Sequence, residues 1–132
     1  MMADERLDRL LDYTKFHIGI YLSFGGGLVA LIGTGETGQI EMLAALISCP
    51  TALLFSLVFM TLAGLSGGII ASGCTQYQSF NELWNEPQGP AGWKLLNGKY
   101  WANIEHISFW ISLVFITYAV IGSKVVKIIF GG

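Results

Sequence analysis

No charged side chain interrupts residues 42–81, which read MLAALISCPTALLFSLVFMTLAGLSGGIIASGCTQYQSFN, a run of 40 positions. A helix rises 1.5 Å per residue, so about 20 apolar residues cross the roughly 30 Å of hydrocarbon in a bilayer. The run offers no obvious polar turn, and residues 39–48 before it are apolar enough to form an interfacial helix or the first turns of a longer span kinked at Pro50. We therefore predict one transmembrane helix over residues 50–72. A fourth crossing hidden in the same run is the alternative.

Two further stretches of the chain carry no Asp, Glu, Lys or Arg: residues 16–35, with 20 positions, and residues 106–123, with 18. Only 12% of the chain is charged, whereas a soluble domain carries about 25%. The sequence thus predicts an all-α integral membrane protein with three transmembrane helices. Their expected bounds are 16–33, 50–72 and 104–122.

The remaining segments are polar. Residues 1–15 have Leu7, Leu10 and Leu11 on one helical face, which predicts a short amphipathic helix at the membrane surface. Residues 16–132 form the membrane domain, and a polar, aromatic-rich loop is expected at 73–103. Basic residues collect on the cytoplasmic side of membrane proteins. We therefore predict a cytoplasmic N-terminus and an outer C-terminus, because this orientation places five basic residues inside and two outside. The five are Arg6, Arg9, Lys15, Lys94 and Lys99, and the two are Lys124 and Lys127.

Residues 33–38, GTGETG, have the G-x-G-x-x-G spacing of a dinucleotide-binding loop. That loop needs an acidic residue about 20 positions later, where this chain has the apolar sequence TALLFSLVF. We therefore interpret GTGETG as a tight turn beyond the first span. We predict no cofactor, and the lack of a basic patch excludes a nucleic-acid partner.

Small residues recur every four positions within two of the predicted spans. Such rows let helix backbones approach closely, which drives helix association in lipid. The rows pack the spans within one chain, or one of them faces a second copy and produces a homo-oligomer. They consist of Gly19, Ser23 and Gly27, and of Gly64, Gly68 and Ser72.

Four residues of metal-binding type fall near the expected cytoplasmic face: His17, Cys74, Glu105 and His106. Polar residues also collect at helix ends because water is there, and no metal-binding motif includes these four. We therefore predict neither a metal site nor catalytic residues. Ionisable residues in the middle of the spans, the usual mark of proton relays, are not expected, which argues against an ion-coupled transporter and an enzyme.

The 73–103 loop holds Trp84, Trp93 and Trp101. Trp favours the membrane interface, so these rings either anchor the loop on the bilayer or form a docking surface for a protein partner.

A short amphipathic helix followed by glycine-rich spans resembles the architecture of small bacterial membrane effectors and holin-like pore formers, including some in anti-phage defence. The resemblance implies a location in the bacterial inner membrane. We expect a small self-associating protein that forms or perturbs a membrane pathway. The alternative is an accessory subunit that anchors a larger membrane complex.

Overall fold

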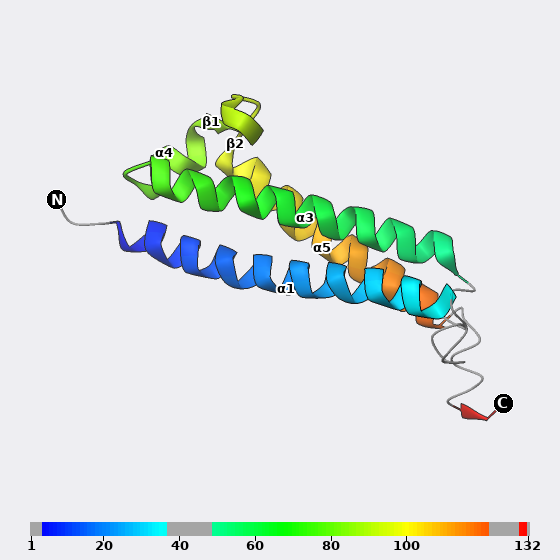
Figure 1. Ribbon diagram of the computed structural model, residues 1–132. Coiled ribbons are helices and arrows are strands. Elements are labelled where there is room, and N and C mark those ends of the chain that lie inside the picture. The colour runs from blue at the N-terminus through cyan, green and yellow to red at the C-terminus, as the bar shows by residue number, and fades with distance from the viewer. Residues whose placement is uncertain (1–3, 37–48, 122–129, 132) are drawn as a thin grey trace.

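The fold consists mainly of three long helices that run side by side (Figure 1). The computed structural model describes residues 4–36, 49–121 and 130–131. The long helices are α1 (Glu5–Glu36), α3 (Pro50–Gln76) and α5 (Gly98–Ile121). Helix α3 packs closely against both of the others, whereas α1 and α5 meet through long side chains. The alternative of a fourth crossing in the 42–81 run falls partly on residues 42–48, which lie outside the described residues.

Helix α1 joins the predicted amphipathic helix and the first predicted span into one element (Glu5–Glu36). Its last four residues include Gly33 and Glu36, so the predicted turn at GTGETG is wrong for that part of the hexapeptide. A helix satisfies its own backbone hydrogen bonds where water is scarce, and isolated glycines do not end it. The segment before the hexapeptide is also helical, whereas a dinucleotide-binding loop follows a strand. Residues 37 and 38 lie outside the described part.

The other two long helices extend further than predicted toward the connecting loop. Helix α3 begins at Pro50 and continues to Gln76 before Tyr77 turns to extended backbone. Helix α5 begins at Gly98, where we expected the span to start at residue 104. The added turns are supported by packing, because Cys74 and Ala102 belong to one buried cluster. The loop expected at 73–103 is therefore shortened to residues 77–97.

Residues 77–97, which we call the head, are folded rather than irregular. They contain α4 (Phe80–Asn85), β1 (Pro87–Gln88), the 3-10 turn η1 (Pro90–Gly92) and β2 (Leu96–Asn97). The two short strands pair antiparallel, with Pro87 opposite Asn97. The head meets the start of α1, where the Phe80 N–H donates to the Asp4 carboxylate at 2.8 Å. The start of α1 and the head thus share one end of the molecule.

The interface between α3 and α5 is built mainly from small residues. The buried positions of α3 follow a spacing of three and four residues, which is typical of paired helices. They include Leu53, Ser56, Met60, Ala63, Gly67, Ile70 and Cys74. Opposite them, α5 buries Gly98, Ala102, Glu105, Ser108, Ser112 and Ala119.

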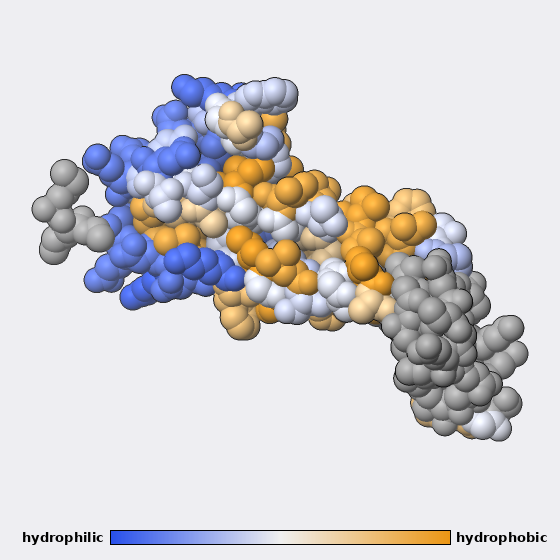
Figure 2. Space-filling model, viewed as in Figure 1, coloured by the Kyte–Doolittle hydropathy of each residue, from blue (hydrophilic) through white to orange (hydrophobic). Residues whose placement is uncertain are grey.

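The outer faces of the bundle are apolar. Figure 2 shows hydrophilic residues gathered at the end that carries the head and the start of α1, and hydrophobic residues over much of the remaining surface. Large side chains such as Leu22, Leu65 and Val114 are more than half exposed. Among the described residues, α3 and α5 are long and apolar enough to cross a membrane.

Candidate functional site

A buried carboxyl group lies where the three long helices meet. Glu105 of α5 is 1% exposed and Tyr21 of α1 is 2% exposed. The Tyr21 hydroxyl donates to Glu105 Oε1 at 2.9 Å. Gly67 of α3 lies next to this carboxyl group, because a Cβ added at Gly67 would come within 3.4 Å of the carboxyl carbon. Glycine at this position therefore leaves room for the Glu105 side chain.

The position of Glu105 corrects the sequence analysis. We expected it at the start of the third span, and expected no ionisable residue further inside. Helix α5 begins at Gly98, so Glu105 lies about two turns within the apolar helix, and its side chain faces the interior. An ionisable side chain thus lies inside the helix bundle, at a depth that the charge-free stretches did not indicate.

Two histidines and a second tyrosine lie next to this pair. The Tyr13 hydroxyl is 2.8 Å from Nε2 of His106. The rings of His17 and Tyr13 are 3.9 Å apart between centroids, and those of His17 and His106 are 6.2 Å apart. The His17 ring is also 6.1 Å from that of Tyr21. We refer to Tyr13, His17, Tyr21, Glu105 and His106 as the Glu105 cluster.

The hydrogen bonds fix the proton positions on the histidine rings. Nδ1 of His106 is 2.7 Å from the Ala102 carbonyl oxygen, and Nδ1 of His17 is 2.8 Å from the Tyr13 carbonyl oxygen. A carbonyl oxygen only accepts, so Nδ1 carries a proton in both rings. In the neutral ring Nε2 is then the acceptor, and for His106 it accepts from the Tyr13 hydroxyl. Each Nε2 is thus the nitrogen that can bind a further proton.

Three of the four metal-binding residue types singled out from the sequence come together here. His17, Glu105 and His106 belong to the Glu105 cluster, whereas Cys74 packs with Leu7 and other apolar residues nearer the head. Within the described ranges, no group of three or more His, Cys, Asp or Glu side chains is arranged to hold a metal ion. Acids, histidines and hydroxyls in contact can bind and transfer protons.

The sequence analysis missed Tyr13 and Tyr21. A signal was present, because Tyr13, His17 and Tyr21 are four residues apart and therefore share one face of α1. A stripe of hydroxyl and imidazole groups in an otherwise apolar helix marks a polar surface that needs a partner. The partner, Glu105, is 84 residues away in the chain from Tyr21.

The structure places the predicted small-residue rows largely on outer surfaces. Cβ atoms added at Gly19, Gly27 and Gly68 would have nothing within 4 Å. One added at Gly64 would make an ordinary contact with Tyr21, at 3.9 Å. Ser23 and Ser72 are exposed. The close α3–α5 contact uses other positions, including Ala63 and Gly67, and a role of the predicted rows between copies stays a prediction.

The three tryptophans proposed for docking have different surroundings. Trp84 stacks on Phe80, with 5.0 Å between ring centroids. Trp101 lies in α5, where its Nε1 donates to the Gln88 carbonyl oxygen at 2.7 Å. Trp93 is 66% exposed. Of these three rings, Trp93 is the one open to a partner or to lipid, and the docking role stays a prediction.

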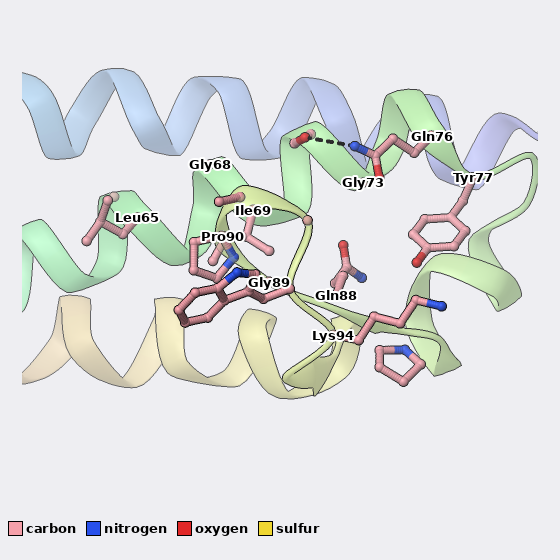
Figure 3. A pocket seen from close by; sticks show the side chains of 16 residues that line it. Leu65, Gly68, Ile69, Gly73, Gln76, Tyr77, Gln88, Gly89, Pro90 and Lys94 are labelled. Atoms are coloured by element: carbon pink, nitrogen blue, oxygen red, sulfur yellow. Dashed lines mark hydrogen bonds between the residues drawn. The ribbon is translucent and has the colours of Figure 1, made fainter.

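A groove of about 500 Å³ lies between the head and α3. Figure 3 shows Gly68, Ile69 and Gly73 of α3 on one side, with Gln88 and Lys94 of the head on the other. In Figure 3 the polar side chains of Gln76 and Lys94 lie toward one end of the groove and the apolar side chain of Leu65 lies toward the other. This distribution suits the boundary between headgroups and hydrocarbon, where Lys and Tyr are common.

The chain matches no protein-family model, no curated protein and no solved structure.

Proposed function

We propose that the chain is an integral membrane protein whose α1, α3 and α5 each cross the bilayer. Helices that form the core of a soluble protein are mostly buried, whereas the most apolar windows of α3 and α5 are 39% and 22% buried. Their outer faces carry large apolar side chains, which are stable in lipid and costly in water. The exposed apolar surface is the observation that carries this proposal.

The distribution of charge supports a cytoplasmic location for the head. Five basic residues flank one end of the bundle: Arg6, Arg9, Lys15, Lys94 and Lys99. Asp4 contacts Phe80 at this end, so α1 and the head lie on the same side of the membrane. The positive-inside bias then makes this side cytoplasmic, which for a bacterial protein is the inner face of the inner membrane.

Within the membrane we propose that copies of the chain associate and form or perturb a pathway, as pore-forming effectors do. Gly19 and Ser23 line an open groove of about 510 Å³ on α1, bordered by Phe16 and Phe24. A shallow row of small residues between bulky ones fits the backbone of a second helix.

The mass of the protein purified in mild detergent tests self-association. A defined homo-oligomer is expected, together with ion leakage from liposomes that contain it. Gly19→Leu and Gly68→Leu place bulk on outward faces where helices would approach, and should reduce both the mass and the leakage. Thr117→Leu, on an exposed face of α5, is the control and should change neither.

A monomer that aggregates in the absence of other proteins would contradict self-association and favour the accessory-subunit alternative. Leakage that persists unchanged in both glycine variants would contradict the proposed contact surfaces.

A further inference from the structure

We propose that Glu105 is a proton-binding site inside the membrane domain and that the proton is the ion carried by the pathway. The second half of this statement rests on the proposed function, whereas the first half is tested independently below.

The surroundings of Glu105 favour a functional carboxyl over a structural one. The described salt bridges, Arg6–Asp4 and Arg9–Glu5, lie at the outer end of α1, and neither includes Glu105. An ionisable group within an apolar span is costly and is found where protons or ions are bound. Glutamine would accept the Tyr21 hydrogen bond equally well, so packing alone does not require an acid here.

The ionisable groups that face Glu105 come from two of the three helices. Helix α1 presents Tyr13, His17 and Tyr21, and α5 presents His106. Helix α3 presents Gly67, which has no side chain. The two histidines are thus the neighbours whose ring nitrogens can both bind and release a proton. His106 follows Glu105 directly in α5, and the His17 ring of α1 lies 6.1 Å from the Tyr21 ring, whose hydroxyl donates to Glu105.

Proton exchange through these histidines is chemically balanced. Nε2 of either ring takes a proton from water on the head side and forms an imidazolium. Transfer of a proton to the Glu105 carboxylate restores the neutral imidazole and leaves a neutral carboxylic acid. Release follows the reverse steps, and no other reactant is consumed.

Buried hydroxyl groups continue from Glu105 toward the far end of the α3–α5 interface. Ser108 is 3% exposed, and Ser112 and Ser56 are fully buried. The hydroxyls of Ser56 and Ser112 are 2.8 Å apart. The hydroxyls of Ser56 and Ser112 can each donate to the other or to a backbone carbonyl oxygen, so their protons have alternative acceptors. The polar groups thus extend along the helices and do not stop at one end.

The first experiment measures the proton on Glu105 directly. Infrared difference spectra of the full chain in liposomes, recorded between pH 4 and pH 9, should contain a protonated-carboxyl band that titrates with pH. Glu105→Gln should remove the band, and Glu86→Gln, in the exposed part of the head, should retain it. A titrating band that survives in Glu105→Gln, or no such band in the wild type, overturns the proton-binding site.

The second experiment measures flux in liposomes with a pH-sensitive dye inside and, in parallel, the efflux of K⁺. A pH gradient should drive proton entry that falls at least tenfold in Glu105→Gln and stays near wild type in Glu86→Gln. Equal proton fluxes in wild type and Glu105→Gln, with K⁺ efflux retained, would overturn the proton as the carried ion and leave the proposed pathway standing. Loss of all flux in the wild type would instead overturn the pathway itself.

Discussion

At the scale of single residues, the Gln88 side chain of the head packs against Gly73 of α3 and Gly98 of α5. Its side-chain Nε2 donates to the Leu83 carbonyl oxygen at 2.8 Å. The side chain fits between Gly73 and Gly98, because a Cβ on Gly73 would overlap its amide oxygen and a Cβ on Gly98 would overlap Leu83. The two glycines therefore mark the places where the helices leave space for the head.

This close contact predicts opposite effects for two Gly→Ala substitutions. Gly98→Ala introduces a methyl group against the Leu83 backbone, and we expect a loss of about 1–3 kcal/mol in the free energy of unfolding. Gly26→Ala adds a methyl group with nothing within 4 Å, and we expect a gain of up to about 1 kcal/mol from helix propensity. Reversible unfolding in detergent, followed by circular dichroism, measures both. Equal effects would contradict the close packing of Gly98.

Asp4 links the first turns of two helices. Its Oδ1 accepts from the Arg6 N–H at 3.0 Å, and its Oδ2 accepts from the Phe80 N–H at 2.8 Å. The hydrogen bond from Phe80 favours the ionised carboxylate and lowers the pKa of Asp4 below its usual value of 3.8. Because the pKa is lower in the folded state, the ionised carboxylate stabilises the fold at pH values above the usual pKa. This stabilisation disappears as the pH falls through the lowered pKa.

The linkage predicts a pH-dependent difference between the wild type and Asp4→Asn. The wild type should have the higher Tm above about pH 4, because the carboxylate is then ionised. The two Tm values should converge as the pH falls below 3.8, the usual pKa of the group. Thermal unfolding across this range is the measurement, and Asp12→Asn, at an exposed position of α1, is the control. A Tm difference that does not depend on pH would show that the charge of Asp4 is not what stabilises the contact.

The residue types of the candidate site were visible in the sequence, whereas their proximity was not. Missing charges predict the spans, and they predict Glu105 at a span end because it borders a charge-free stretch. Charge patterns cannot show that a helix begins at Gly98, because that start depends on how the head contacts α3. Nor can they show that the Tyr21 hydroxyl reaches across to α5.

At the scale of helices, Ser56 and Ser112 form a reciprocal link between α3 and α5. The Ser56 hydroxyl donates to the Ser112 carbonyl oxygen at 2.9 Å, and the Ser112 hydroxyl donates to the Ser56 carbonyl oxygen at 2.7 Å. Both side chains are fully buried. Because the residues around them are small, the two helix backbones lie close enough for these hydrogen bonds to form. In lipid, such hydrogen bonds stabilise a helix pair in addition to its packing.

Removal of one hydroxyl should weaken the α3–α5 pair measurably. We expect Ser112→Ala to lower the free energy of unfolding by roughly 0.5–1.5 kcal/mol, the usual range for interhelical hydrogen bonds in membranes. Titration with a denaturing detergent measures the change. Thr117→Ala removes a hydroxyl that bonds within its own helix, to the Leu113 carbonyl oxygen, and should have a smaller effect. A double-mutant cycle with Ser56→Ala should give a coupling that is not zero.

The helices themselves could be predicted from periodicity and charge, but their partners could not. The rows at Gly19 and Gly68 suggested close helix contacts, yet the close contact within the chain uses Gly67 and the serines of α5. Adjacent positions such as Gly67 and Gly68 face about 100° apart on a helix. Both faces of α3 are rich in small residues, so the spacing alone does not tell which face meets α5.

At the scale of the whole molecule, the two ends of the bundle differ in chemistry. The head and the start of α1 form a polar end, and the helices extend from it with apolar outer faces (Figure 2). This difference between the two ends favours the orientation with the polar end in the cytoplasm, because basic residues near membrane spans are retained there. The contact between Asp4 and Phe80 requires α1 and the head to share that side.

Labelling of single cysteines tests this orientation. In a variant with Cys49 and Cys74 replaced by serine, a cysteine is placed at Asp12 or at Lys94, both of them exposed. If the polar end is cytoplasmic, both positions react with a membrane-impermeant maleimide only after the inner membrane is opened. Reaction of both in intact spheroplasts would reverse the orientation and leave the fold unchanged. Reaction of one but not the other would place α1 and the head on opposite sides, which the Asp4–Phe80 hydrogen bond does not allow.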